Sequence, residues 1–463
     1  MNDSLIGTLL IYTNKDRSGK RRLPSGEPRR VSGILGDSIM AQVVKDIRHA
    51  YRPDWPKRDL RDANYGETRD PSVPAVLLEL LSHQNYADMR YALDPAFRRM
   101  VARAVYKGIG RFMASRHNTS FIPQPLSPTA LHSHLTSDSL IVTWQAQRDS
   151  LEPQADASYF VVYRRKNGGA WDNGTCVSDC RIAWPLQAGV RYDICVAGGN
   201  AGGISLRSDI VSSYRSTNND IPILVVDAFD EVRGPKMMAF DSLTGGIVPG
   251  SRPIPDGYEM AYIGEQINYN RRDPWHSDDD CGFGMCNMNR QGQLLVGNTH
   301  DYTVQHGRAL QQLNRSFVSC TSNALTEADS AYTLIDVILG KSSVSTVKKI
   351  NIWADSLNWT QGDKHVLMSG AYVGTLSHAC ASGKLKMCDT TYTFQQELNT
   401  ERLSAEDVSA VSKLAPTDKV IARYSDTGLP AAIHGTNYTI FGLPLETLDN
   451  FDVVYKHIIN SNE

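Results

Sequence analysis

The chain of 463 residues has no run of about 18 apolar residues, which is the length that a membrane-spanning helix needs. It also has no excess of positive charge, because 48 Lys and Arg residues are balanced by 50 Asp and Glu residues. Domains that bind nucleic acids usually carry a basic surface, and a locally basic stretch such as 15–30 lacks the aromatic residues that stack on bases. We therefore expect neither a membrane span nor a nucleic-acid partner, and we interpret 15–30 as a solvated loop.

Cysteine is also scarce, with eight residues. Two pairs lie close in sequence, Cys176 with Cys180 and Cys281 with Cys286. Either pair is compatible with a disulfide or with two free thiols. Zinc is a weaker third interpretation, because no second Cys/His pair follows at the spacing of a zinc finger. The cysteines therefore leave the redox compartment open.

A length of 463 residues corresponds to about three domains, and the first of them, which we place at 1–120, is predicted to be α/β. We expect no signal peptide in it, since the strand-like segment Leu5–Tyr12 follows neither a basic start nor a cleavage site. Apolar residues at four-residue intervals then predict an amphipathic helix with one buried face. They are Leu35, Ile39, Val43 and Ile47.

A second buried strand is expected at Val73–Leu78, followed directly by the carboxylate of Glu79. Open α/β sheets place their active sites at the carboxyl ends of strands, so a glutamate there suits acid/base chemistry. An ordinary carboxylate that faces water is the simpler interpretation. A long amphipathic helix comes next, with Asp94 as N-cap and Pro95 in the first turn, where proline is tolerated. Its predicted core face comprises Phe97, Val101, Val105, Ile109 and Phe112.

The pattern changes after the proline-rich linker 123–128. Short alternating strands are predicted at Leu140–Trp144, Tyr159–Tyr163 and Arg191–Ala197, with Asn-Gly turns in the intervening segments. About 90 residues with this rhythm predict a β-sandwich. We place this second domain at 121–217.

This region resembles a fibronectin type III module. The resemblance rests on Trp144, on Tyr192 with Leu186 six residues before it, and on the glycine-rich ending Val196–Ser205. In that family the tryptophan lies in the core and the tyrosine hydroxyl bonds to the backbone. The resemblance therefore implies structural roles for Trp144, Leu186 and Tyr192, in a module that serves as a spacer or a binding domain.

The third region, 218–463, opens with the apolar strand Ile221–Phe229, in the style of a central parallel strand. The segments Ala331–Leu339 and Lys348–Trp353 fit either helix or strand. His365–Gly374 is typical of a strand, a tight turn and the start of a helix. We interpret the region as a Rossmann-like or flavodoxin-like α/β sheet with long inserted loops, one of them at 268–297.

The segment Gly370–Gly374 has the glycine spacing of a nucleophile elbow. Its central residue is Tyr372, and a tyrosine with its usual pKa of roughly 10 is a poor nucleophile for acyl transfer. The turn and the opening strand resemble the glutamine-amidotransferase-like α/β folds, but the cysteine of that family is missing. We therefore favour a structural turn here over a hydrolase site.

Two further groups of residues point only weakly to metal chemistry. The acidic run His276–Asp280 lacks the alternating oxygen ligands and the final glutamate of a calcium loop, so a solvated loop is the simpler interpretation. His300, His306 and His434 show no pairing at ligand spacing. We expect them to be surface histidines or hydrogen-bonded ones.

The stretch Leu60–Phe112 resembles the C-terminal part of zinc-dependent N-acetylmuramoyl-L-alanine amidases, which cut the amide between the glycan and the stem peptide of bacterial cell walls. The matching segments are Val73–Glu79, Asn85, Leu93–Phe97 and Ala104–Ile109. In the family the glutamate of that strand is the acid/base residue beside the metal, so the resemblance makes Glu79 the candidate catalytic residue. The match loosens after Glu79, where residues 81–84 replace a Gly-Phe-Leu-Ser sequence.

That family binds zinc through two histidines and a glutamate that precede the matching part. No histidine precedes His49 here, and neither His49 nor His83 occupies a family ligand position. A catalytic zinc needs three protein ligands and an open position for water. We therefore expect no metal and no cofactor in this chain. The prediction is an amidase-like protein that is inactive by itself, with a missing N-terminal half or a partner chain completing the site.

Together, the three regions resemble multidomain cell-surface proteins of Bacteroidetes that are often named xanthan lyase, although no residues here support lyase chemistry. The resemblance implies a periplasmic or cell-surface location, with peptidoglycan or a surface glycan as partner. The alternative function is a non-catalytic protein that binds glycan or another protein.

Overall fold

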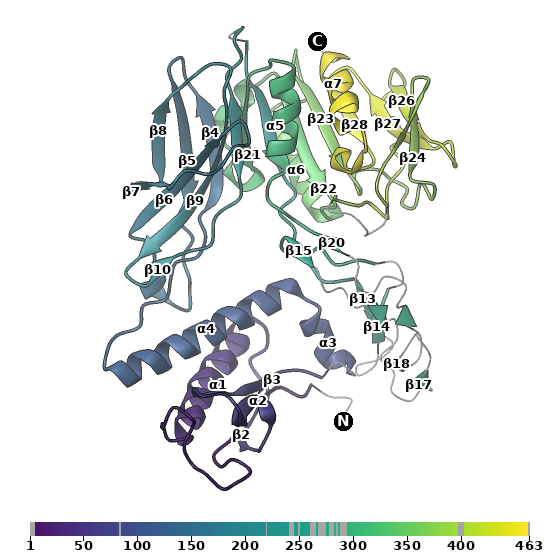
Figure 1. The fold of residues 1–463 in the computed structure, drawn as a ribbon. Helices are drawn as coiled ribbons and strands as arrows, with labels where there is room; N and C mark the ends of the chain where they lie inside the picture. Colours follow the sequence, from purple (N-terminus) through teal and green to yellow (C-terminus); the bar gives the residue numbers. More distant parts are fainter. Residues whose placement is uncertain are drawn as a thin grey trace. The chain divides into compact units, whose positions relative to one another are not determined.

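The computed structural model shows two compact units (Figure 1). The first comprises Met1–Pro123, Val232–Asp256 and Met260–Gln293, and the second comprises Gln124–Glu231, Gly257–Glu259 and Leu294–Glu463. The structure describes the whole chain except residues 1–4, 83–84, 219, 240–244, 249–250, 260–264, 267–274, 277–281, 284–285, 288–293, 397–401 and 462–463. Among the described residues, none of the helices combines the length and the apolar character that a bilayer crossing requires.

The first unit is built on a three-stranded sheet and two long helices that share one core. Strand β1 is the central strand, parallel to β2 and antiparallel to β3. The main elements are β1 (Thr8–Tyr12), α1 (Arg30–Ala50), β2 (Lys57–Asp62), β3 (Leu77–Glu79) and α4 (Pro95–His117). The short helices α2 (Gly66–Arg69) and α3 (Tyr86–Ala92) complete this part of the chain.

Helix α1 confirms the predicted amphipathic helix, since all four residues of its apolar stripe are buried. The start of α4 is also confirmed, because the carboxylate of Asp94 accepts a hydrogen bond from the amide of Ala96 and Pro95 stands in the first turn. The predicted core face of α4 is wrong at Ile109, which is 43% exposed. The buried stripe passes instead through Ala104 and Gly108, whose lack of a side chain lets α4 approach the backbone of α1 at Ile39.

The predicted buried strand at Val73–Leu78 is wrong in extent. Only Leu77–Glu79 forms a strand, and Val73 is 59% exposed. The reason is Pro74, which has no N–H to donate to a neighbouring strand.

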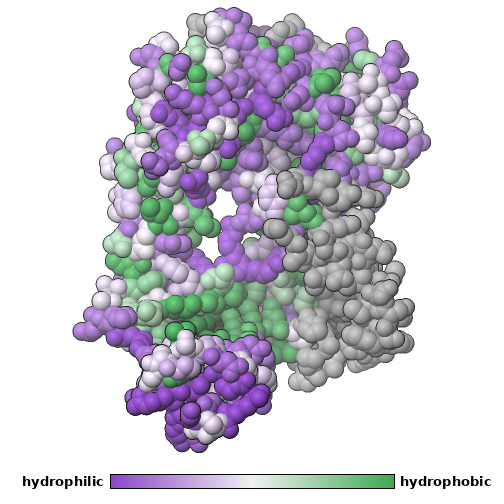
Figure 2. Space-filling model, in the orientation of Figure 1, coloured by the Kyte–Doolittle hydropathy of each residue, from purple (hydrophilic) through white to green (hydrophobic). Residues whose placement is uncertain are grey.

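Helix α4 carries both polar and apolar surface. Figure 2 shows hydrophobic surface along this helix, where Ile109 and Met113 are exposed.

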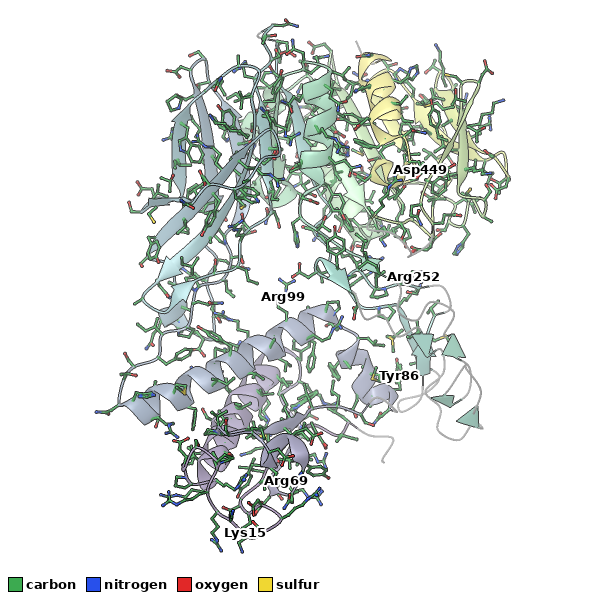
Figure 3. All side chains as sticks on the ribbon, viewed as in Figure 1. Lys15, Arg69, Tyr86, Arg99, Arg252 and Asp449 are labelled. Atoms are coloured by element: carbon green, nitrogen blue, oxygen red, sulfur yellow. The ribbon has the colours of Figure 1, made fainter. Side chains whose placement is uncertain are left out.

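Arg99 reaches from α4 to Asp256, with 2.8 Å between Nη2 and Oδ2 (Figure 3). Within the first unit, the segment Val232–Asp256 therefore contacts the N-terminal part both through an ion pair and through apolar packing, since Ile247 packs with Tyr86 of α3.

Short strand pairs occupy the middle of the chain. They are β13 (Met237–Ala239) with β14 (Gly245–Ile247), β15 (Tyr258–Glu259) with β20 (Leu295–Val296), β16 (Glu265–Gln266) with β19 (Cys286–Asn287), and β17 (Trp275–His276) with β18 (Gly282–Phe283). The loop predicted at 268–297 therefore contains strand pairs, and much of it lies outside the described residues.

The second unit begins with a β-sandwich. One sheet has the order β4-β5-β8 and the other the order β7-β6-β9-β11, with the short β10 paired to β9. The strands are β4 (Thr129–Leu135), β5 (Ser139–Gln145), β6 (Tyr159–Lys166), β7 (Thr175–Val177), β8 (Arg181–Pro185), β9 (Arg191–Asn200), β10 (Gly203–Ile204) and β11 (Val211–Tyr214). A 3₁₀ turn, η1 (Pro153–Ala155), precedes β6. The three predicted strand segments coincide with β5, β6 and β9.

The rest of the second unit is a five-stranded parallel sheet with the order β21-β12-β22-β23-β28. Helices α5 and α7 cover one face and α6 covers the other. These elements are β12 (Ile223–Asp227), α5 (Tyr302–Gln312), β21 (Phe317–Thr321), β22 (Leu334–Gly340), α6 (Val344–Ser356), β23 (His365–Gly370), β28 (Tyr438–Phe441) and α7 (Phe451–Ser461). The 3₁₀ turns η2 (Ser322–Ala324), η3 (Glu327–Ala331) and η4 (Leu445–Thr447) lie in the connections.

An antiparallel extension continues the sheet beyond β28, in the order β28-β27-β26-β24-β25. Its strands are β24 (Lys384–Met387), β25 (Thr390–Thr393), β26 (Lys419–Tyr424) and β27 (Pro430–His434). The two segments that fitted either helix or strand are now assigned, as β22 and as part of α6. The helix start predicted after the turn at Gly370 is wrong, because the chain enters turns there and continues to β24.

The sandwich and the parallel sheet are joined edge to edge. Strand β21 pairs with both β4 and β11, so the sheets of the two predicted domains meet at one strand. At this seam the hydroxyl of Ser319 accepts a hydrogen bond from the amide of Ser212 at 2.7 Å, and the amide of Ser319 donates to the hydroxyl of Ser133 at 2.9 Å. Because these groups are buried, the seam holds the two sheets together through satisfied polar contacts.

Candidate functional site

Glu79, the residue that the amidase resemblance singles out, stands on the edge strand of the first unit. Among the strands that the structure describes, β3 pairs with β1 alone, and Glu79 lies opposite Leu9 with its side chain exposed. The neighbouring pairs in the same ladder are aliphatic, Leu10 with Leu78 and Ile11 with Leu77. The ladder therefore offers no oxygen, nitrogen or sulfur ligand next to this carboxylate.

Zinc does not fit this environment. In the part of the chain that the structure describes, no group of three or more His, Cys, Asp or Glu residues is placed to hold a metal ion. His49 is exposed in the last turn of α1, and His83 lies outside the described residues. We therefore derive no step through a metal at Glu79.

The carboxyl edge of the parallel sheet holds a second cluster of titratable groups. Strand β12 lies between β21 and β22. The chain forms β21 on one side of β12 and then crosses to form β22 on its other side, so the connections to these two neighbours diverge next to β12. Asp227 ends β12 and is 6% exposed, and its carboxylate accepts a hydrogen bond from the amide of Phe229 at 3.1 Å. Burial, together with the charge of Asp209, raises the pKa of Asp227 to about 8.

His300 lies close enough to Asp227 for its charge to act on the Asp227 carboxyl group. His300 Nδ1 lies 2.8 Å from Oδ1 of Asp209, and its charge acts on Asp227 in the opposite direction to that of Asp209. His300 has a left-handed backbone with φ of 58°, and its amide donates to Oδ1 of Asn298. The cluster thus places a carboxylic acid that is protonated at neutral pH near a carboxylate–imidazole pair, an arrangement that is able to donate and accept protons.

The glycine turn around Tyr372 is shaped by close packing. A Cβ on Gly370 would lie 2.7 Å from Cβ of Leu339, and a Cβ on Gly374 would lie 2.3 Å from the carbonyl oxygen of Ala410. The amide of Gly374 donates to Ser409. Both glycines are therefore required for the close approach of neighbouring backbone, and Tyr372 is half-buried in the turn between them.

Sequence reasoning missed a buried ionic cluster under α5 and α7. His306 of α5 donates through Nδ1 to Asp336 of β22 at 2.6 Å and through Nε2 to Glu446 at 3.0 Å. Tyr455 of α7 donates to the same oxygen of Asp336 at 2.5 Å. Burial alone would lower the pKa of His306, but Asp336 and Glu446 outweigh it and raise that pKa to about 10. The signal in the sequence was Asp336 itself, a charged residue inside the apolar strand β22, which needs a buried partner.

The residues singled out in the sandwich lie in its interior. Trp144 and Tyr192 are each 3% exposed, Trp144 packs edge to face on Phe160, and Leu186 is partly buried against the same core. Arg164 lies over the ring of Tyr192. Within the described chain, no hydrogen bond links the Tyr192 hydroxyl to the backbone.

The remaining sequence candidates are placed as follows. Cys176 and Cys180 are free thiols. Cys281 lies outside the described residues, as does most of the acidic run 276–280, and the side chain of Cys286 is not described. His434 is hydrogen-bonded to Thr439.

No family model matches the chain, and no curated protein matches it. Solved structures that are similar to part of it include the twitchin kinase region from C. elegans (18% identity, 19% of this chain, 16% of that chain, TM-score 0.17). A fourth FNIII domain from human (20% identity, 21% of this chain, 82% of that chain, TM-score 0.18) and an FN3 domain of human collagen XX (22% identity, 20% of this chain, 97% of that chain, TM-score 0.16) are others. The chain is a sheet-rich multidomain protein, and the strand order of Thr129–Tyr214 around the buried Trp144 makes that segment a sandwich of the fibronectin type III kind.

Proposed function

We propose that this chain is a non-catalytic protein that binds peptidoglycan or a surface glycan, and that its first unit is related to the N-acetylmuramoyl-L-alanine amidases without their hydrolysis. The observation that carries the proposal is the position of Glu79. It is an exposed carboxylate on an edge strand, and its neighbours in the ladder are aliphatic.

Amide hydrolysis in that family depends on water activated by a metal. A carboxylate beside such a water acts as a base, whereas a carboxylate in bulk solvent has no polarised nucleophile to serve. Glu79 has the second environment. Binding, which needs shape and polar contacts but no activated water, is therefore the function that this geometry supports best.

The domain content supports a surface role. Fibronectin type III modules mostly space or bind, and here the sandwich is fused to the parallel sheet through β21. We assign the parallel sheet to the flavodoxin-like class, because its strands follow the chain order 2-1-3-4-5. A periplasmic or cell-surface location belongs to the same proposal.

A second candidate function rests on the outer edge of β3, which pairs with no other strand among the described residues. A partner polypeptide that adds a strand there would bring new side chains beside Glu79, and exposed strand edges favour such pairing. In that case the chain would be one part of an amidase whose metal ligands come from the partner.

The test uses the full chain with purified peptidoglycan and soluble muropeptides. We expect the chain to sediment with peptidoglycan and to release no stem peptide, with or without added zinc. The Glu79→Gln variant should sediment as the parent does, as should the matched control Glu67→Gln, which changes another exposed glutamate of the same unit. Release of stem peptide that is lost in Glu79→Gln and kept in Glu67→Gln would overturn the proposal. Absence of sedimentation would refute peptidoglycan binding.

A further inference from the structure

A cavity of about 490 Å³ in the second unit is lined by residues of α7 and of the antiparallel extension of the sheet. Figure 1 labels these elements as α7, β24, β26, β27 and β28. Strands β24, β26, β27 and β28 form its walls together with the end of α7. The volume is within the range of pockets that hold small organic ligands, roughly 300–1,000 Å³. The cavity is separate from Glu79 and from the cluster at Asp227, and none of its residues belongs to either.

The polar lining of this cavity is cationic. Lys386, Lys419 and Arg423 line it together with the imidazoles of His434 and His457, and the lining residues that the structure describes include no Asp or Glu. The whole chain, by contrast, has slightly more acidic than basic residues. The cavity therefore has a positive potential that the composition of the chain does not predict.

Among the described residues, neighbouring carboxylates make no direct contact with these cations, although the charge of Asp418, next to Lys419 in sequence, acts on His434. In the described part of the chain, no Asp or Glu forms an ion pair with Lys386, Lys419 or Arg423. The guanidinium of Arg423 donates instead to the carbonyl oxygen of Gly428 at 2.9 Å. The side chains of the three cations are exposed, so solvent or a ligand can contact them.

The strand register concentrates this charge. Lys386 of β24 lies directly opposite Arg423 of β26, and Lys419 of β26 lies directly opposite His434 of β27. Of these two pairs, Lys386 with Arg423 places like charges directly opposite each other, which destabilises an antiparallel pair. Burial, and then the charge of Lys419, lowers the pKa of His434. An anion bound beside Lys386 and Arg423 would relieve the repulsion between their charges.

The rest of the lining is aliphatic or small. Met387, Val420, Ile421, Ala422 and Ile458 contribute apolar surface, and no Trp, Tyr or Phe is among the described residues of the lining. A bare inorganic anion would leave this apolar surface unused, and an uncharged ligand would leave the cations unpaired. The lining suits a molecule with one strongly anionic end and one apolar part.

We propose that this cavity binds a small organic phosphate, with the phosphate held by Lys386, Lys419 and Arg423 and the organic group packed against Met387, Val420 and Ile458. Arginine and lysine together recognise phosphate well, since guanidinium provides a planar pair of donors and ammonium a compact charge. The inference goes beyond glycan binding and does not depend on it.

Cys388 provides a reporter within the site. It is an exposed free thiol that lines the cavity, and Cys176 is an exposed free thiol on β7 of the sandwich that does not line it. Alkylation of the two thiols by iodoacetamide can be followed separately by peptide mass spectrometry. The second thiol serves as an internal control in the same tube.

The experiment measures both alkylation rates in the full chain with phenyl phosphate, inorganic phosphate or benzyl alcohol. Phenyl phosphate should slow alkylation of Cys388 several-fold at millimolar concentration and leave Cys176 unchanged. Inorganic phosphate should protect Cys388 more weakly, benzyl alcohol should not protect it, and added salt should reduce the protection. Equal rates with and without phenyl phosphate would overturn the proposal. If inorganic phosphate protects Cys388 as strongly as phenyl phosphate does, the apolar lining does not contribute to binding. If benzyl alcohol protects Cys388, binding does not require an anionic group.

Variants give a second readout. The double substitution Lys386→Gln/Lys419→Gln should weaken protection of Cys388 by phenyl phosphate at least ten-fold. Lys348→Gln, which removes an exposed lysine from α6 outside the cavity, should leave protection unchanged. Parent-like protection in the double variant would show that these lysines do not hold the phosphate. Cys380, a buried free thiol just before β24, should stay unalkylated if the variants are folded.

Discussion

Nδ1 of His306 lies 2.6 Å from Oδ2 of Asp336, and both side chains are completely buried. The pair joins α5 to the central strand β22, and Glu446 and Tyr455 add contacts from two further segments. Side chains from α5, β22, η4 and α7 therefore meet in one cluster around the imidazolium. The second oxygens of Asp336 and Glu446 have no partner among the described residues, so the cluster depends on the charge of the histidine.

We predict that His306→Ala lowers the free energy of unfolding of the second unit by about 3–5 kcal/mol, because two buried carboxylates lose their cation. His378→Ala serves as the control, since His378 is paired with Asp407 at the surface and such pairs contribute about 0–1 kcal/mol. Calorimetry of the full chain measures the shift. A change in His306→Ala no larger than in His378→Ala would contradict the role of the cluster.

Stability should also depend on pH through His306. Its pKa in the folded protein is raised to about 10, above the usual 6.5 of a histidine in the unfolded chain. The stabilisation is therefore fully present below about pH 6.5 and is lost as the pH rises toward 10. We expect the free energy of unfolding to fall over that window in the parent, and to fall less steeply in His306→Ala. Denaturation curves at pH 6, 8 and 10 test this, and parallel pH profiles would refute it.

For Asp227, in contrast to His306, the charged form destabilises the folded protein. Its pKa is raised from 3.8 to about 8, so the folded protein holds a proton that the unfolded chain has released. The parent therefore loses stability as the pH rises from about 4 to 8. Asp227→Asn keeps an oxygen for the Phe229 amide and removes the titration, so we predict that it is more stable than the parent at pH 8 and that its advantage shrinks toward pH 4. Equal stability of the two proteins at pH 8 would show that the carboxyl group ionises at no cost.

The first unit has its own buried ion pair. Nζ of Lys107 on α4 lies 2.6 Å from Oδ2 of Asp46 on α1, and Gln42 donates to the same carboxylate. We predict that Lys107→Met lowers the free energy of unfolding by about 3–5 kcal/mol, and that Lys107→Met/Asp46→Leu recovers most of the loss because no buried charge is left unpaired. Calorimetry again provides the measurement. If the double variant is no more stable than the single one, the loss comes from packing and not from the uncompensated charge.

The helices and strands with clear apolar periods were predictable, as α1 and β12 illustrate. The departures have local causes. Pro74 shortens β3. In α4, Gly108 allows a close approach to α1, and this contact buries Ala104 and Gly108 in place of Ile109. A single sequence also does not show which strands become neighbours, so the fusion at β21 was not foreseen.

The site residues were harder to predict than the fold. Glu79 was found through a family resemblance, and its exposed position on an edge strand is a property of the folded sheet. His306, Asp336 and Glu446 lie far apart in sequence and carry no motif. The cations of the cavity likewise come together only through the register of β24, β26 and β27.

The most direct test of the proposed function is the zinc content of the full chain after equilibration with excess zinc and removal of unbound metal, measured together with cleavage of muropeptides. Our account predicts far less than one zinc per chain and no cleavage. One tightly held zinc per chain, with cleavage that Glu79→Gln abolishes, would contradict it.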